Sequence, residues 1–282
     1  MTDFSIYEVG PRDGLQSADT ITSTHDKVTL IRKIANTGIK NIEIGSMVNP
    51  DRVPNMADSE VVFLKVQDLA SSHNLGMLVP NRVGVERAKS VGVEKYNIFF
   101  SPSNYFNVNN LGKNLNTIFA EYSGALDKIP TKNVRVYLST SFGCPIMGEI
   151  PPKDMLKTME WANTLGDTIV LSDTIGSANP SLIRKVMRLT DRKIDAKIAL
   201  HLHHGVREGR MYDNLSAGFD CGITQFDSSI GGMGGCPFVP GSGGNLATEQ
   251  LIHWADKENL DCGVTLKDLE PLVKFVNTKI KV

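Results

Sequence analysis

The sequence has few cysteines, no excess of charge of either sign and no long apolar run. The four cysteines among 282 residues form no C-x-x-C pair, which argues against a disulfide framework and against a structural zinc site. The 30 basic and 31 acidic residues give a net charge of −1, so neither nucleic-acid binding nor anionic-membrane binding is indicated. Apolar runs fall short of the roughly 20 residues that span a bilayer, and no secretory signal is recognisable. These absences predict a cytoplasmic protein.

Short β-rich runs alternate with longer amphipathic stretches along the chain. Strands are predicted at Ser5–Val9, Lys40–Ile44, Leu75–Val79, Lys95–Phe100, Val134–Ser139, Thr168–Ser172, Lys197–Leu202 and Ile223–Ser228. Helices are predicted at His25–Thr37, Ser59–Ser71, Arg82–Val91, Ile118–Lys128, Pro152–Leu165, Pro180–Thr190 and Arg207–Gly218. Asn179 before Pro180 is typical of a helix start, and Gly166 and Gly218 are expected to end helices.

Eight strands, each followed by a helix, are the pattern of an α/β protein with a closed (β/α)₈ barrel, the TIM barrel. A doubly wound open sheet is the alternative that strand counting leaves open. No linker or low-complexity tract divides the chain, so residues 1–282 are expected to form one catalytic domain. The segment Leu266–Lys279, with Thr265 as its N-cap, exceeds the eight units. Residues 265–282 are therefore predicted to form a helical extension packed on the barrel.

Three of the six histidines fall within four residues at the end of the predicted strand Lys197–Leu202. Because side chains alternate along a strand, His201 and His203 point the same way and can bind one metal ion. Histidines satisfied by water or by local hydrogen bonds are the simpler alternative. Parallel β/α proteins place their chemistry at the C-terminal ends of their strands, which favours the metal site.

Other chemically active residues also follow the C-terminal ends of predicted strands. They are Arg12, Asp13, Glu43, Asp173, Cys236 and Asn245. Imidazole, carboxylate and amide ligands together suit Mg²⁺ or Mn²⁺, with Zn²⁺ possible. A metal with open positions can bind an alkoxide and a carbonyl and polarise the C–C bond between them, while Arg12 could stabilise an enolate. Simpler roles stay open, namely a turn for Asp13, a helix cap for Asp173 and a surface ion pair for Glu43.

A glycine-rich segment, Gly231–Asn245, follows the last predicted strand and carries seven glycines in fifteen residues. Such a segment is either a flexible connector or a mobile lid that approaches a ligand closely. It does not match the phosphate-binding pattern G-x-x-x-x-G-K-[ST]. Cys236 is poorly placed there for a core cysteine, which favours a reactive or proton-donating thiol.

Several sequence blocks, in matching order and spacing, carry a family resemblance. They are Glu8–Gln16, Val53–Asp58, Phe142–Pro145, Asp173–Gly176, His201–His203, Asp227–Pro237 and Gly244–Glu249. The chain resembles the 3-hydroxy-3-methylglutaryl-CoA (HMG-CoA) lyases, which are metal-dependent TIM-barrel enzymes related to Claisen-type synthases. The resemblance implies a homodimeric lyase of leucine degradation that uses Mg²⁺ or Mn²⁺ to cleave HMG-CoA into acetoacetate and acetyl-CoA.

The same resemblance implies a role for each matching residue. The metal ligands would be Asp13, His201, His203 and Asn245. Arg12 would bind the substrate and stabilise the acetyl-CoA enolate, and Cys236 would help to protonate it. Asp13 or His201 would act as the base. Glu43 and Asp173 would support the site, and Ser46 and Thr174 would line the acyl pocket.

Two segments depart from the family pattern close to the site. The run from His204-Gly205 to Asn214 is longer than usual, and Glu43–Met47 lacks the usual aromatic residue. A related 3-hydroxyacyl-CoA, such as citramalyl-CoA or a longer-branched glutaryl-CoA, is therefore an alternative substrate. A 4-hydroxy-2-oxoacid aldolase would account for His204 but not for the Cys236 segment. A metal-binding barrel without catalytic activity is the non-enzymatic alternative.

Overall fold

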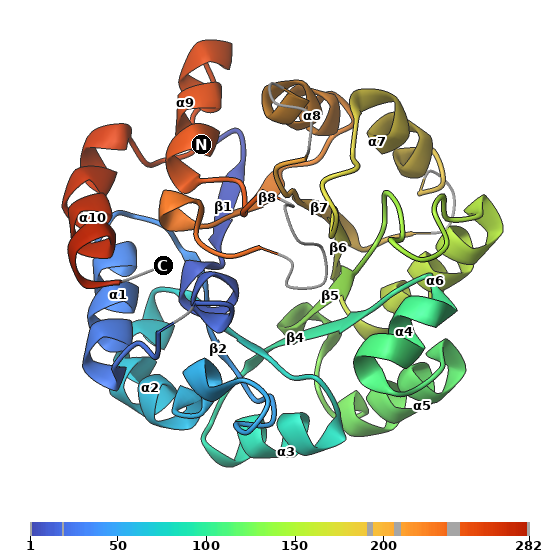
Figure 1. Cartoon of the computed structure of the whole chain (residues 1–282), viewed down its shortest axis with the longest axis horizontal. Helices are drawn as coiled ribbons and strands as arrows, with labels where there is room; N and C mark the ends of the chain where they lie inside the picture. The colour runs from blue at the N-terminus through green and yellow to red at the C-terminus, as the bar shows by residue number, and fades with distance from the viewer. Residues whose placement is uncertain (1, 19, 191–193, 206–209, 236–242, 281–282) are drawn as a thin grey trace.

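The computed structural model describes residues 2–18, 20–190, 194–205, 210–235 and 243–280. Its eight parallel strands close into a barrel in which each strand pairs with the next and β8 pairs with β1 (Figure 1). The strands are β1 (Ser5–Glu8), β2 (Asn41–Ser46), β3 (Asn74–Leu78), β4 (Lys95–Phe100), β5 (Val134–Leu138), β6 (Thr168–Ser172), β7 (Lys197–His201) and β8 (Gln225–Ser228). The closure confirms the predicted TIM barrel and excludes the open sheet.

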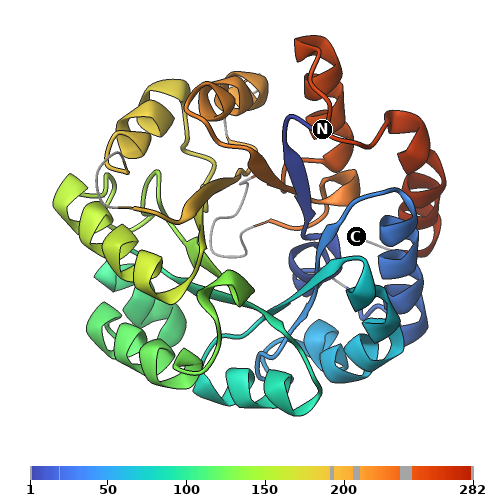
Figure 2. The same ribbon diagram turned by 180° about the vertical axis from the view of Figure 1, so that it is seen from behind.

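Helices form an outer ring around the barrel (Figure 1 and Figure 2). They are α1 (Thr24–Asn36), α2 (Ser59–Val66), α3 (Arg82–Ser90), α4 (Asn104–Leu111), α5 (Leu115–Leu126), α6 (Pro152–Leu165), α7 (Pro180–Met187), α8 (Arg210–Asp220), α9 (Thr248–Glu258) and α10 (Leu266–Lys279). α10 follows Thr265 and packs against α1 and α9. Within the described residues, no helix is both long and apolar enough to cross a membrane.

Two of these helices, α4 and α9, were not predicted from the sequence. Half of α4 is asparagine, a residue of low helix propensity, so its sequence gives only a weak helical pattern. Its ends are nevertheless defined, because Ser103 Oγ accepts a hydrogen bond from Phe106 N at 3.2 Å and Gly112 adopts left-handed backbone with φ 68°. α4 matters for function because Phe106 and Asn110 line the central cavity.

The prediction that Gly218 ends a helix is wrong. Gly218 lies inside α8, which continues to Asp220. A Cβ at position 218 would lie 2.5 Å from Leu200 Cδ1, so glycine allows α8 to pack closely against β7. The structure confirms the predicted helix end at Gly166, which follows α6, and the predicted helix start at Asn179, which precedes α7. Asn179 Oδ1 accepts a hydrogen bond from Leu182 N at 3.0 Å.

Glu8, at the end of β1, joins three segments that are distant in sequence. Its carboxylate accepts hydrogen bonds from Gly10 N and Ile230 N, both at 2.9 Å, and from Thr248 Oγ1 at 2.5 Å. The side chain is fully buried. Glu8 therefore links the turn after β1 to the turn after β8 and to the start of α9.

The free energy of unfolding is expected to depend on pH through Glu8. Burial raises the pKa of this carboxyl from 4.5 to about 7. Between these values the unfolded chain releases the proton and the folded chain keeps it, so rising pH favours unfolding and the effect is complete above pH 7. Relative to Glu8→Gln, the parent should lose up to about 1.4 kcal/mol per pH unit in this window.

Urea denaturation of both proteins at intervals from pH 4.5 to 8 measures this difference. If the two curves of unfolding free energy against pH run parallel through the window, the assignment to Glu8 is contradicted. The constant offset between them would then reflect only the altered contact with Thr248. Glu258→Gln, at the exposed end of α9, controls for the substitution itself.

Candidate active site

Arg12 and Asp13 lie on a π-helical turn, Gly10–Gly14, directly after β1. The amide groups of Arg12 and Asp13 both donate to Val9 O, at 3.1 and 2.7 Å. Position 10 requires glycine, because a Cβ there would lie 2.6 Å from Glu8 Oε1. The local sequence therefore directs both side chains toward the C-terminal mouth of the barrel, as predicted.

His201 and His203 face each other at the end of β7. Their Nε2 atoms are 3.0 Å apart. The Nδ1 atom of His201 lies 3.2 Å from Asp227 Oδ2, and that of His203 lies 3.4 Å from Thr174 O. Because each Nδ1 faces an acceptor, each ring can carry its proton on Nδ1, which leaves two adjacent Nε2 lone pairs free for a ligand.

Asp13 and Asn245 complete this group at the barrel mouth. One ligand atom from each of Asp13, His201 and His203 lies within 4.8 Å of the others. Asn245 Nδ2 donates to Asp13 Oδ2 and to Met233 O, both at 2.8 Å. Its Oδ1 is buried and has no hydrogen-bond partner in the described part of the chain.

These four residues fit a divalent cation. Two imidazole nitrogens facing each other beside a carboxylate, with an unpartnered buried amide oxygen nearby, are groups that a cation would satisfy. The set mixes nitrogen and oxygen donors and contains no thiolate, which is compatible with Mg²⁺, Mn²⁺ or Zn²⁺.

The protonation states of Asp13 and His203 also favour a cation, whereas burial lowers the pKa of His201 but the hydrogen bond to Asp227 raises it above its usual value, so that a metal would displace a proton there. Burial and the neighbouring His201 lower the pKa of His203 to about 4, so this imidazole is neutral at pH 7. Burial opposes ionisation of Asp13, but Arg12 and the two histidines outweigh it and lower the pKa of the carboxyl to about 2. Neutral imidazole and ionised carboxylate are the forms that bind metals.

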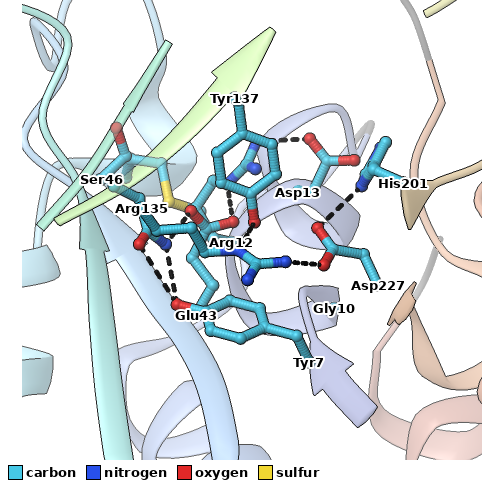
Figure 3. Close-up of polar contacts among 12 residues, drawn as sticks. Tyr7, Gly10, Arg12, Asp13, Glu43, Ser46, Arg135, Tyr137, His201 and Asp227 are labelled. Atoms are coloured by element: carbon cyan, nitrogen blue, oxygen red, sulfur yellow. Dashed lines mark hydrogen bonds and ion pairs between the residues drawn. The ribbon is translucent and has the colours of Figure 1, made fainter. Parts of the chain in front are cut away.

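Arg12 is held beside Asp13 by a second carboxylate, that of Glu43 (Figure 3). Its Nε donates to Glu43 Oε2 at 2.5 Å, and its Nη1 pairs with Asp13. Glu43 is fully buried and also accepts a hydrogen bond from Asn97 Nδ2 at 2.7 Å. The alternative of a surface ion pair for Glu43 is therefore wrong, and Glu43 instead orients the guanidinium at the cavity wall.

Asp173 and Thr174 belong to the loop after β6. Asp173 accepts hydrogen bonds from Ser177 N at 2.8 Å and Ala178 N at 3.0 Å, and burial raises its pKa to about 6. It therefore fixes this loop and does not cap α7, which begins after Asn179. Thr174 lines the central cavity.

Of the remaining predicted site residues, Ser46 does not line this cavity within the described part of the chain. Ser46, at the end of β2, is fully buried, and its Oγ has no partner among the described residues. Cys236 lies outside the described residues, although the preceding Gly235 lines the cavity.

The central cavity, of about 210 Å³, adjoins a larger groove of about 810 Å³. Arg12, Asp13, His201 and His203 line the cavity. The cavity and the groove share the lining residues Gln16, Ser17, Phe99 and Asn110. A small reacting group can therefore lie in the cavity while a long attached chain occupies the groove.

Sequence reasoning missed two charged residues inside the barrel, Arg135 on β5 and Asp227 on β8. Both are buried and they form an ion pair (Figure 3). Arg135 lies in an otherwise ordinary alternating strand, so nothing in its local pattern marks it. Asp227 lies one residue before the end of β8 and pairs in register with His201, and its place at the same barrel mouth as the histidines was the available signal.

Nearly the whole chain matches a single family model, described as HMGL-like, over residues 3–276. The chain belongs to the HMGL-like family. It is 34% identical to a hydroxymethylglutaryl-CoA lyase of Bacillus subtilis, over 98% of this chain and 93% of that protein. It is 32% identical to (R)-citramalyl-CoA lyase of Chloroflexus aurantiacus, over 95% and 88%.

A solved HMGL-like structure extends the comparison to bound ligands. An HMG-CoA lyase from Acinetobacter baumannii, in complex with coenzyme A and 3-methylmalate, matches this structure with a TM-score of 0.90 at 30% identity. The match covers 97% of this chain and 90% of that chain. The family resemblance inferred from the sequence blocks is therefore confirmed.

Proposed function

We propose that this protein is a divalent-metal-dependent carbon–carbon lyase that cleaves HMG-CoA into acetoacetate and acetyl-CoA. The observation that carries the proposal is the position of Arg12 beside Asp13, His201 and His203 in one cavity. Similarity to HMG-CoA lyases over nearly the full chain supports the choice of reaction.

Asp13, His201, His203 and Asn245 would hold the metal, for which Mg²⁺ and Mn²⁺ are the first candidates. When bound, the metal supplies Lewis-acid polarisation of substrate oxygens. The fit rests on the convergent Nε2 atoms, the ionised Asp13 carboxylate and the unpartnered Asn245 Oδ1.

The protein groups would carry the proton and the developing charge. The Asp13 carboxylate accepts the proton of the C3 hydroxyl as the C2–C3 bond breaks, and C3 becomes the ketone of acetoacetate. His201 stays in the ligand role, because Nε2 would face the metal and Nδ1 faces Asp227. The electron pair of that bond passes into the thioester as an enolate, which the Arg12 guanidinium stabilises. Cys236 then returns a proton to C2, which gives acetyl-CoA. Glu43 keeps Arg12 in place throughout.

The acyl-CoA class of substrate is supported by the groove that continues from the cavity. Its volume of about 810 Å³ leaves room for a pantetheine arm, and Arg52 on its wall offers positive charge to phosphate groups. Lys113 on the same wall is paired with Glu121 at 2.7 Å. Thr174 would contact the acyl group from the cavity wall. Ser46 would act from behind that wall, because it is buried at the end of β2.

A related hydroxyacyl-CoA is the second candidate substrate, and two observations favour it. The chain is also similar to a citramalyl-CoA lyase. In addition, His203 also lines a separate cavity of about 360 Å³, together with His204, Arg210 and Asn214, which offers space for a different acyl group. The aldolase alternative loses its support, because His204 Nε2 lies 2.8 Å from Gln250 Oε1 and His204 does not line the central cavity.

Metal-dependent cleavage of HMG-CoA is the expected result of the first assay. Acetoacetate release is followed with Mg²⁺ or Mn²⁺, then after EDTA, then after metal is restored. Turnover should be lost with EDTA and should return with metal. If calorimetry detects metal binding and HMG-CoA is not cleaved, citramalyl-CoA is tested next. Inactivity on both would contradict the proposed function.

Three further properties stay predictions beside this proposal. The homodimer, the cytoplasmic location and the place in leucine degradation follow only from the resemblance or from composition. Size-exclusion chromatography with light scattering tests the first of them directly.

A further inference from the structure

The buried Arg135–Asp227 ion pair has no part in the reaction proposed above. Arg135 and Asp227 are 6% and 1% exposed inside the barrel. Removing two charges from water is costly unless each is well paired and hydrogen-bonded. A pair in this position therefore calls for a role that two apolar residues could not fill.

The contacts of Asp227 lead directly to the metal group. Its Oδ2 lies 3.2 Å from His201 Nδ1, and its Oδ1 pairs with the Arg135 guanidinium (Figure 3). The Tyr137 hydroxyl is a further hydrogen-bond donor to this carboxylate. The carboxylate therefore bridges an internal cation and a candidate metal ligand.

Arg135 is itself fixed from several sides. Its Nη1 donates to Gln225 Oε1, and its Nε lies 3.4 Å from Tyr137 Oη. The guanidinium carbon lies 4.2 Å from the centre of the Tyr7 ring, within cation–π range. Arg135 can therefore hold Asp227 in one orientation with little freedom.

The orientation of Asp227 decides which nitrogen of His201 carries the proton. A carboxylate can only accept, so the proton sits on Nδ1 and the lone pair of Nε2 stays available. That Nε2 atom is the one that faces His203 Nε2 at 3.0 Å. Opposite the Nδ1 atom of His203 lies a neutral backbone carbonyl, Thr174 O, at 3.4 Å. The tautomer and ring orientation of His201 are therefore fixed more strongly, by a carboxylate, than those of His203.

We infer that Asp227 is the positioning residue of this metal centre and that Arg135 holds Asp227 in position. Asp227 orients the His201 ring and fixes its tautomer, which raises metal affinity without Asp227 itself touching metal or substrate. The inference rests on the proposed function in that it takes His201 as a metal ligand. It does not depend on which acyl-CoA is cleaved.

The test compares the parent protein with Asp227→Asn, because an amide is nearly the same size but can donate as well as accept. Mn²⁺ affinity is measured by titration without substrate, and we expect about 10–100-fold weaker binding. Ring ¹⁵N NMR of the metal-free proteins at alkaline pH should show His201 protonated on Nδ1 in the parent and redistributed toward Nε2 in the variant. A loss of packing alone would not change the tautomer.

Two further variants serve as controls, one for removal of a nearby buried polar group and one for misfolding of Asp227→Asn. Tyr7→Phe removes a buried hydroxyl, 2.9 Å from Asn97 Nδ2, and keeps the ring that stacks on Arg135, so Mn²⁺ affinity should stay within about twofold of the parent. Asp227→Asn leaves the Arg135 charge without its carboxylate and can fail to fold. Arg135→Met combined with Asp227→Asn removes that charge, and the double variant should show the same loss of affinity and the same tautomer change.

The outcomes separate this inference from the proposed function. Unchanged Mn²⁺ affinity and an unchanged His201 tautomer in a folded variant would overturn the inference, even if the parent cleaves HMG-CoA. Weakened affinity together with a changed tautomer would support it, even if the parent cleaves no acyl-CoA tested. A parent that binds no divalent metal would overturn both.

Discussion

His203→Ala should lose divalent-metal binding and acyl-CoA cleavage while the barrel stays folded. The change removes one of the three side chains whose ligand atoms lie within 4.8 Å of one another. Removing only an outer partner of a metal ligand already costs about 10–100-fold in affinity, so loss of the ligand itself should exceed 100-fold. Mn²⁺ titration measures the affinity, and far-UV circular dichroism reports the fold.

The neighbouring histidine provides a matched control. The His204 ring turns away to Gln250, with Nε2 2.8 Å from Oε1, and it does not line the central cavity. His204→Ala should therefore keep Mn²⁺ affinity within about twofold of the parent. Full affinity in His203→Ala, or equal losses in the two variants, would disprove the assigned ligand set.

Arg12→Met should lower kcat by about 10²–10³-fold and leave Mn²⁺ affinity within a few-fold of the parent. Those are the losses found when a donor that stabilises developing negative charge is removed. Arg12 touches the candidate metal ligand Asp13 but is not itself a ligand, so the two readouts should separate. Steady-state kinetics on HMG-CoA, with kcat and KM reported separately, measures the effect.

Removing Arg12 also leaves the buried Glu43 without its cation. Arg12→Met combined with Glu43→Gln removes that uncompensated charge, so its kcat should be as low as that of Arg12→Met in a more stable protein. Arg12→Lys keeps a positive charge but cannot contact Glu43 and Asp13 with two separate edges, and only partial recovery is expected. A normal kcat in the folded double variant would exclude the role proposed for Arg12.

The arrangement of the barrel and of its mouth could be predicted from the sequence because both follow from local periodicity. Alternation along β7 places His201 and His203 on one face, and parallel strands bring their C-terminal ends to one rim. The same reasoning could not predict the buried ion pair that contacts His201 from inside the barrel. Arg135 and Asp227 are 92 residues apart, and only closure of the barrel brings them together.

Errors in detail have equally specific physical causes. α4 was missed because tertiary packing of Phe106 and a Ser103 cap outweigh poor local propensity. The end of α8 was misplaced because Gly218 serves close packing on Leu200, not chain reversal. Whether Glu43 forms a surface ion pair or belongs to the site depends on its burial. That burial is produced by other strands of the barrel, so the segment around Glu43 could not reveal it.

The contact between Asn245 and Asp13 spans 232 residues, and that between Thr248 and Glu8 spans 240. The candidate metal group is thus assembled from segments far apart in the sequence, with β1 and β8 side by side only after ring closure. On the ribosome, the first ligand emerges long before the last one exists. Metal capture is therefore a late event of biosynthesis, and nascent chains that stop short of Asn245 cannot form the complete centre.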